Sequence, residues 1–192
     1  MTVRPVLRIG DPALRVAARA VARDELASTE VRTLVDDLVD TMRAADGAGL
    51  AATQVGVALR VCVVEVRQPN PRYPYKPSIP LTVLVNPVVT PLGDETWDVY
   101  EGCLSVPGLR GRVARFTEVR VTAWDRDGRD VDLVARGVTA GTYQHELDHL
   151  DGRLFVDRVT DTTTLCTWEE FDRWHRDAFV ARAEAIVARF GE

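Results

Sequence analysis

Residues 145–149 read HELDH, and this stretch decides how the rest of the chain is arranged. Two histidines four residues apart on a helix lie one turn above each other, so both imidazoles can bind one divalent metal ion. Glu146 lies about 100° around the helix from His145 and can bond a water on that ion without binding the ion itself. Residues 138–150, followed by Gly152, are therefore predicted to form a metal-binding helix.

Two imidazoles leave a third metal ligand to be found. Downstream, the remaining histidine is His175, which we interpret as a helix-surface residue. Upstream, Cys103 in the stretch Glu-Gly-Cys-Leu-Ser is the better candidate, because a thiolate binds such ions well. Cys62 and Cys166 are interpreted as small buried hydrophobic residues. Asp148 either faces away from the ligands or orients a histidine ring, and the sequence leaves both open.

Composition indicates one compact domain spanning residues 1–192, with 46% hydrophobic residues and a net charge of −5. This charge gives no basic patch for nucleic acid, and no apolar run is long enough to span a membrane. Three cysteines are too few for a secreted disulfide framework and indicate the cytoplasm. The single lysine, Lys76, argues against Schiff-base and phosphate-loop chemistry. The arginine-rich N-terminus contains Pro5 and Pro12 and is expected to belong to the fold.

The remaining pattern predicts an α+β fold. Apolar residues at helical spacing from Val31 to Met42 predict an N-terminal amphipathic helix. Strands are predicted at 59–66, 81–85 and 96–100. A hairpin of 119–124 and 131–134 is predicted around the turn Asp125-Arg126-Asp127-Gly128. A long C-terminal helix is predicted from a capping box at Thr167 towards Phe190. The expected architecture is mostly antiparallel sheets around the central metal-binding helix, flanked by these two helices.

Two further segments are expected near a site. Residues 47–54, GAGLAATQ, contain glycines that let the backbone approach a ligand closely, and Gln54 offers an uncharged amide donor. Residues 67–80 contain five of the ten prolines, which favours an extended loop. That loop is either a surface excursion between two strands or a lip over a binding cleft.

Three stretches together resemble the peptide deformylase family in one order: GAGLAATQ at 47–54, EGCLS at 101–105 and QHELDH at 144–149. The resemblance extends from about Val6 to Val156, with residues 67–80 as an insertion relative to short members. It implies removal of the N-formyl group from the initiator methionine of new proteins, with release of formate.

The resemblance also implies roles for individual residues. The implied metal ligands are Cys103, His145 and His149. They leave a fourth position open for water, whose proton Glu146 would take and return to the leaving amine. The amide of Gln54 and the backbone N–H of Leu104 would stabilise the negative oxygen of the tetrahedral intermediate.

Further residues are expected to bind substrate or to support the site. Gly49 would pair with the main chain of the substrate. The methionine side chain would lie in a pocket lined by Val138, Gly141 and Thr142, which the absence of a side chain at Gly141 makes roomy. The remaining pair, Glu101 and Arg115, would brace the cysteine turn.

The resemblance implies Fe²⁺ in the cell, whereas Zn²⁺, Ni²⁺ or Co²⁺ suit the same ligands in purified protein. The implied partners are N-formyl-methionyl nascent polypeptides, with transient contact to the ribosome. Two alternatives stay open at this point. One is a zinc peptidase with a glutamate or histidine as third ligand, and the other is a non-catalytic homologue that binds formyl-peptide or inhibitor.

Overall fold

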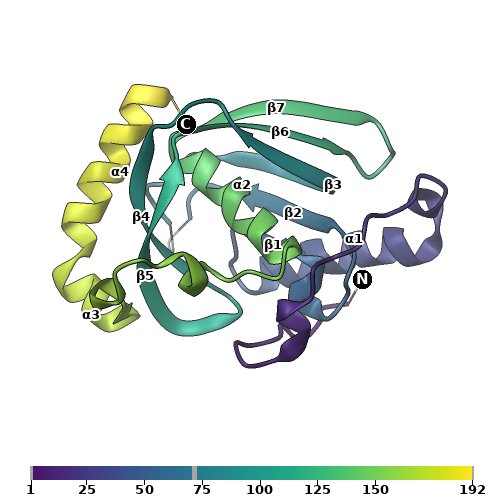
Figure 1. The fold of residues 1–192 in the computed structure, drawn as a ribbon, viewed down its shortest axis with the longest axis horizontal. Coiled ribbons are helices and arrows are strands. Elements are labelled where there is room, and N and C mark those ends of the chain that lie inside the picture. The colour runs from purple at the N-terminus through teal and green to yellow at the C-terminus, as the bar shows by residue number, and fades with distance from the viewer. Residues whose placement is uncertain (1, 71–72, 192) are drawn as a thin grey trace.

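The computed structural model describes residues 2–70 and 73–191, and within this part of the chain there are two antiparallel sheets and four α-helices (Figure 1). The helices are α1 (Thr29–Ala44), α2 (Gly137–Leu150), α3 (Trp168–Trp174) and α4 (Arg176–Phe190). The strands are β1 (Gly49–Ala51), β2 (Val61–Val66), β3 (Ile79–Pro91), β4 (Thr96–Cys103), β5 (Val106–Phe116), β6 (Glu118–Trp124), β7 (Asp130–Arg136) and β8 (Cys166–Thr167).

The larger sheet has the strand order β1-β2-β3-β6-β7, and the smaller has the order β4-β5-β8. All strand pairs in both sheets are antiparallel. The predicted α+β class with mostly antiparallel sheets is thus confirmed. Among the described residues, no helix is long and apolar enough to cross a membrane.

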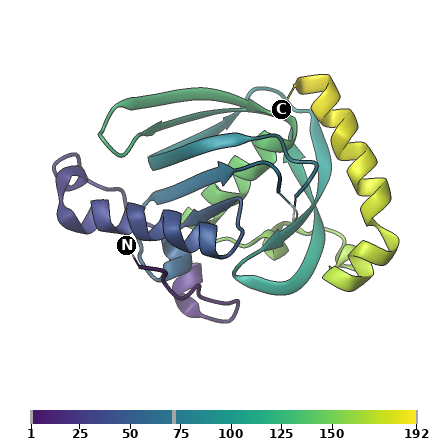
Figure 2. The same cartoon turned by 180° about the vertical axis from the view of Figure 1, so that it is seen from behind.

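The larger sheet is covered on both faces near β1 and β2, which explains why β2 reads as a continuous apolar run. Val61 and Val63 pack against the apolar side of α1, and Figure 2 shows α1 lying across that face. Cys62 and Val64 point to the opposite face, where α2 packs. Alternate side chains of one strand therefore fill two separate cores.

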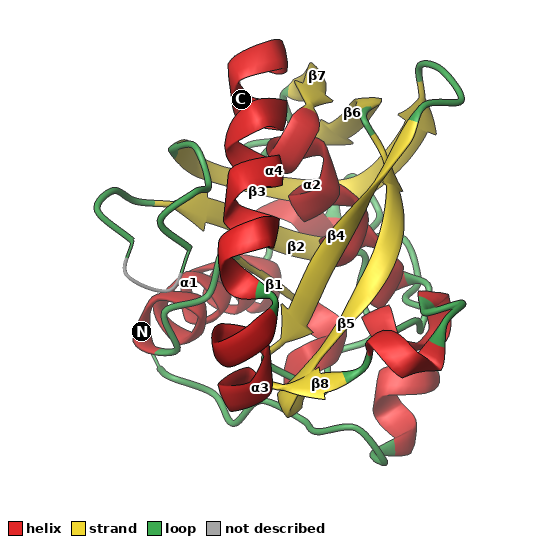
Figure 3. Cartoon of the chain, turned by 90° about the vertical axis from the view of Figure 1, so that its left-hand side faces the viewer, coloured by secondary structure: helices red, strands yellow, loops and turns green. Residues whose placement is uncertain are grey.

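Helix α2 is the centre of the structure, as predicted. It packs on the larger sheet, and its other side faces β4 and β5 (Figures 1 and 3). Every residue of α2 except His145 is buried. A helix that is buried on all sides is held in a fixed position, which suits it for carrying a metal site.

The predicted long C-terminal helix is present as two helices, α3 and α4, which meet at His175. The hydroxyl of Thr167 caps the start of α3 as expected. Phe171 and Phe179 pack with Tyr100 of β4 in an aromatic cluster, and the ring of His175 stacks on Tyr100 at 5.4 Å. Figure 1 shows α4 along the outer side of β4.

The strands differ from the prediction in length and in number. The second and third predicted strands are longer than expected: β3 continues to Pro91 and β4 to Cys103. Strand β5 was not predicted, because its two glycines and buried arginines hide the alternation of a half-buried strand. In the 67–80 stretch, residues 79–80 belong to β3, and residues 71–72 lie outside the described part of the chain.

Candidate metal centre

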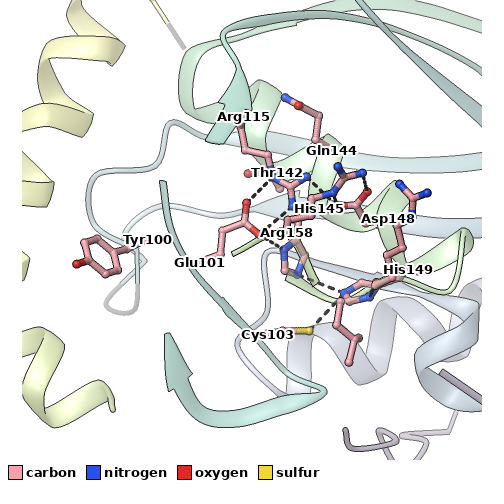
Figure 4. A network of polar contacts seen from close by, with 12 residues as sticks. Tyr100, Glu101, Cys103, Arg115, Thr142, Gln144, His145, Asp148, His149 and Arg158 are labelled. Carbon is pink, nitrogen blue, oxygen red and sulfur yellow. Dashed lines mark hydrogen bonds and ion pairs between the residues drawn. The ribbon is translucent and has the colours of Figure 1, made fainter. Parts of the chain in front are cut away.

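Three predicted ligands from two parts of the fold meet at one point. Cys103 lies at the end of β4, where the register with β5 shifts, and His145 and His149 lie one turn apart on α2. The sulfur of Cys103 is 3.3 Å from Nε2 of His149, which is 3.2 Å from Nε2 of His145. All three ligand atoms lie within 4.8 Å of one another, as Figure 4 shows for the side chains.

The other nitrogen of each imidazole is held by an acceptor. Nδ1 of His145 lies 2.7 Å from Oε2 of Glu101, and Nδ1 of His149 lies 3.1 Å from the carbonyl oxygen of Arg153. A carboxylate and a carbonyl only accept, so each Nδ1 carries the proton. Nε2 is therefore the atom that each ring offers to an ion beside Cys103.

This arrangement fits a divalent ion. Two nitrogens bound tetrahedrally at about 2.0–2.1 Å from one ion lie about 3.3 Å apart, close to the separation seen here. Two lone pairs facing each other at this distance repel unless a cation lies between them. One thiolate and two imidazoles form a soft donor set that suits zinc, iron(II), cobalt or nickel.

The electrostatics favour a cation at this point. Burial raises the pKa of the Cys103 thiol, but the neighbouring His149 and His145 lower it well below its ordinary value. The backbone N–H of Ser105 also points to the sulfur, at 3.4 Å. Burial lowers the pKa of His145, but Glu101 and Cys103 raise it overall to well above the usual value. Without an ion, a proton on the His145 ring compensates the negative charge of Cys103 and Glu101. A bound ion would neutralise the same charge.

Glu146 is buried beside the ligands, and its Oε2 has no hydrogen-bond partner within the described part of the chain. Burial raises the pKa of its carboxyl above the ordinary value, although His145 and His149 oppose the rise. Its other oxygen lies against the backbone of Gly49, where an added Cβ would be only 2.4 Å from Oε1. A side chain at position 49 would therefore displace this carboxylate, so a glycine is required here.

One cleft connects these groups, and most of the predicted site residues line it. The lining residues from the predicted set are Gly49, Gln54, Glu101, Cys103, Leu104, Val138, Gly141, Thr142, His145 and Glu146. We call the part of the cleft lined by Val99, Val138, Gly141 and Thr142 the side-chain pocket. A Cβ at Gly141 would make ordinary contacts with Val99 at 3.8 Å and Arg115 at 4.0 Å, so a small side chain would fit there without a clash.

Gln54 is aimed at the ligand cluster. Its Oε1 accepts from the backbone N–H of Ala51 at 2.9 Å, which fixes the orientation of the amide. Its Nε2 donates to Oγ of Ser105 at 3.1 Å and lies 3.5 Å from the sulfur of Cys103. An uncharged donor is thus held at the edge of the candidate metal site.

A buried ionic network supports the cysteine turn and α2 (Figure 4). Arg115 donates to both oxygens of Glu101, at 2.6 and 3.0 Å, and to Asp148 at 2.7 Å. Arg158 pairs with the same carboxylate of Asp148. The pKa of Glu101 is held well below its usual range, because Arg115 and His145 outweigh the effect of burial.

Several contacts of the site were not predicted. Asp148 orients neither ring directly, and Glu101 is the residue that holds His145. Both are contacts between residues far apart in the sequence, for which no local pattern exists. Two predictions for isolated residues agree with the structure: Cys62 is buried within β2, and His175 lies outside the metal cluster. The prediction for Cys166 is wrong, because this residue is only partly buried.

The loop at 67–80 lies at the cleft in its described part. Tyr73, Tyr75 and Lys76 line the cleft, and Nζ of Lys76 donates to Oγ1 of Thr142 on α2 at 2.8 Å. This agrees with the interpretation of the loop as a lip over a binding cleft.

Known proteins are similar to this chain over most of its length. A model of the polypeptide deformylase family matches residues 3–164. The chain is 49% identical over 166 residues to peptide deformylase 1 of Prochlorococcus marinus (strain MIT 9313), covering 85% of this chain and 84% of that protein. It is 48% identical over 161 residues to peptide deformylase 2 of Ralstonia nicotianae, covering 84% and 89%.

Solved structures give the same result. The class I type b peptide deformylase from Acinetobacter baumannii, bound to Met-Ala-Ser, superposes with a TM-score of 0.79 at 41% identity, covering 82% of this chain and 99% of that one. A peptide deformylase from Synechococcus elongatus in complex with actinonin has a TM-score of 0.73 at 35% identity, covering 94% and 88%. The chain therefore belongs to the peptide deformylase family.

Proposed function

We propose that this protein is a metal-dependent peptide deformylase that hydrolyses the N-formyl group of formyl-methionyl nascent polypeptides and releases formate. The observation that carries the proposal is a buried carboxylate oxygen without a partner in the described structure, on Glu146, beside three converging ligand atoms. A purely structural metal site would have no use for such a group. A zinc peptidase is not favoured, because a cysteine takes the third ligand position in place of glutamate or histidine.

Cys103, His145 and His149 would hold the ion. When bound, a divalent ion supplies positive charge that polarises the formyl group and lowers the pKa of water towards neutrality. Glu101 keeps the proton on Nδ1 of His145, so that Nε2 remains a ligand. Donors from Ser105 and Gln54 favour the thiolate form of Cys103.

Glu146 takes the proton of the attacking water as its oxygen adds to the formyl carbon. It then delivers this proton to the amine nitrogen as the C–N bond breaks, so the products are formate and the free amino terminus. Burial raises the pKa of Glu146, so its carboxyl group can hold the proton between these two steps. The backbone of Gly49 fixes the position from which the carboxylate acts.

Gln54 and the backbone N–H of Leu104 would donate to the formyl oxygen as negative charge develops on it. This assignment is supported by the fixed amide of Gln54 and by the position of both residues in the cleft lining. Gly49 would bind the main chain of the substrate. It lies on β1, which is an edge strand of the larger sheet, and an extended peptide can add to such an edge.

The proposal includes the side-chain pocket of Val138, Gly141 and Thr142 as the site of the methionine side chain. We also propose Fe²⁺ as the metal in the cell, since a thiolate-containing site accommodates this ion. The proposed place of action is the cytoplasm, where new chains leave the ribosome, with transient ribosome contact. The whole chain, 1–192, would form one catalytic domain, which the packing of α4 on β4 supports.

Formate release from formyl-Met-Ala-Ser by anaerobically prepared protein, combined with metal analysis, tests the proposal. Glu146→Gln should lower kcat by about 10²- to 10⁴-fold while the bound metal is retained. Glu184→Gln, on the exposed side of α4, is the matched control and should have wild-type activity. Metal-replete wild-type protein that releases no formate would overturn the proposal, and loss of metal in Glu146→Gln would overturn the role of Glu146.

A further inference from the structure

The side-chain pocket contains a charged group that methionine does not need. Lys76 is half-buried, lines the cleft, and places its ammonium 2.8 Å from the hydroxyl of Thr142. Thr142 lies three residues before His145 on α2 and lines the same pocket (Figure 4). A cationic donor is thus held inside a pocket whose other walls, at Val99 and Val138, are apolar.

The position of the ammonium is built into the fold. Nζ of Lys76 lies 5.0 Å from the ring centroid of Tyr73, within the range of a cation–π contact. Tyr73 is buried and packs edge-on against Tyr75, which packs in turn against Phe179 of α4. The backbone N–H of Lys76 also donates to the carbonyl of Tyr73 at 3.0 Å. Aromatic contacts therefore anchor this part of the loop over the pocket.

The first residue of the substrate is fixed as methionine by the proposed function, on which this inference rests. Oxidation at sulfur is the chemical change that adds a hydrogen-bond acceptor to this side chain without altering its carbon skeleton. In an entirely apolar pocket, the sulfoxide oxygen would be buried without a donor, which costs about 5- to 150-fold in binding. An ammonium group in the pocket wall can donate to that oxygen.

We infer that Lys76 is a specificity-determining residue that allows this enzyme to deformylate peptides beginning with N-formyl-methionine sulfoxide. A Cβ at Gly141 would make ordinary contacts with Val99 at 3.8 Å and Arg115 at 4.0 Å, so the absent side chain leaves room for one further atom, such as the sulfoxide oxygen. The sulfoxide is chiral, and the ammonium approaches from the single direction fixed by Thr142 and Tyr73. The enzyme therefore prefers one sulfoxide epimer over the other.

The test compares kcat/KM for formyl-Met-Ala-Ser and for each epimer of its sulfoxide, measured as formate release. In wild-type protein, the preferred epimer should react within about tenfold of the unoxidised peptide. Lys76→Met keeps an unbranched side chain but removes the charge. It should lower kcat/KM for the preferred epimer by about tenfold or more relative to formyl-Met-Ala-Ser, and should remove the epimer preference.

Arg67→Met is the matched control, because it removes one positive charge near the start of the same loop, from a side chain that is 66% exposed and pairs with Glu65. It should leave the ratio between the substrates unchanged. A second measurement uses the folded wild-type protein: Lys76 is the single lysine, so an amine-acetylating reagent modifies one side chain. Acetylation should reproduce the effect of Lys76→Met, and treatment of Lys76→Met itself corrects for the N-terminal amine.

Turnover of formyl-Met-Ala-Ser with equally poor use of both sulfoxide epimers by wild-type and Lys76→Met proteins would overturn this inference alone. An epimer preference that persists both in Lys76→Met and after acetylation would also overturn this inference alone. Absence of turnover even for formyl-Met-Ala-Ser by metal-replete wild-type protein would overturn the proposed function and this inference with it.

Discussion

Replacing Gly49 by alanine tests whether the backbone at β1 sets the position of Glu146. The added Cβ would lie 2.4 Å from Oε1 of Glu146, whereas ordinary contacts begin at 3.4 Å. The carboxylate must therefore move by about 1 Å, a displacement that costs on the order of 10²-fold in rate at a reacting group. The crowding should also reduce the free energy of unfolding by about 1–3 kcal/mol.

The assay measures kcat for formate release, bound metal and the thermal midpoint. Metal content should stay near the wild-type level, because the clash involves Glu146 and none of the ligand side chains. Gly93→Ala is the control, since a Cβ there meets nothing within 4 Å. In a Glu146→Ala background, Gly49→Ala should cost less than about 0.5 kcal/mol, because the carboxylate is gone. Wild-type kcat in Gly49→Ala, or an undiminished stability cost in the double variant, would refute the reasoning.

Three further outcomes are expected. Arg115→Met should lower the free energy of unfolding by about 3–5 kcal/mol in thermal or urea melts, because it leaves Glu101 buried without its cation. Arg129→Met, at a side chain that is 75% exposed, should change stability by less than about 1 kcal/mol. Gln54→Ala should lower kcat by about 10²- to 10³-fold with unchanged metal content, and a normal kcat would exclude its role at the formyl oxygen. Folding lowers the pKa of Glu101, so the ionised carboxylate stabilises the folded state above about pH 4.5, and this contribution is lost as the pH falls towards the pKa of the folded state. The free energy of unfolding of metal-free wild-type protein should therefore decrease more steeply below about pH 5 than that of Glu101→Gln.

Local sequence patterns predicted the elements whose stability depends on one apolar face or one turn. The stripe from Val31 to Met42 predicted α1, and the Asp-Gly turn between 124 and 131 predicted the β6–β7 hairpin. Strand β5 escaped prediction because Gly111 leaves room for Leu165 and Phe155, both far along the chain. Such a glycine is explained only by its distant neighbours.

The candidate site likewise contains residues that local sequence patterns predicted and contacts that they did not. The histidine pair could be predicted because both residues lie on one helix, and Cys103 could be predicted from the motif around it. The bond from Glu101 to His145 and the contact of Gly49 with Glu146 join residues more than forty positions apart in sequence. The Lys76–Thr142 bond depends on how a proline-rich loop folds back, which composition alone does not specify.

The three ligand atoms belong to pieces of the fold that no strand pairing joins: Cys103 ends a strand of the smaller sheet, and both imidazoles project from the helix packed on the larger one. An ion held by all three would act as a cross-link between the two halves of the molecule. Its binding would then add to folding stability by an amount that grows with the logarithm of the free ion concentration once this exceeds the Kd. Demetallation should therefore loosen β4 and β5 first, and protease cleavage or amide exchange in these two strands would report the loss of the ion before the rest of the protein unfolds.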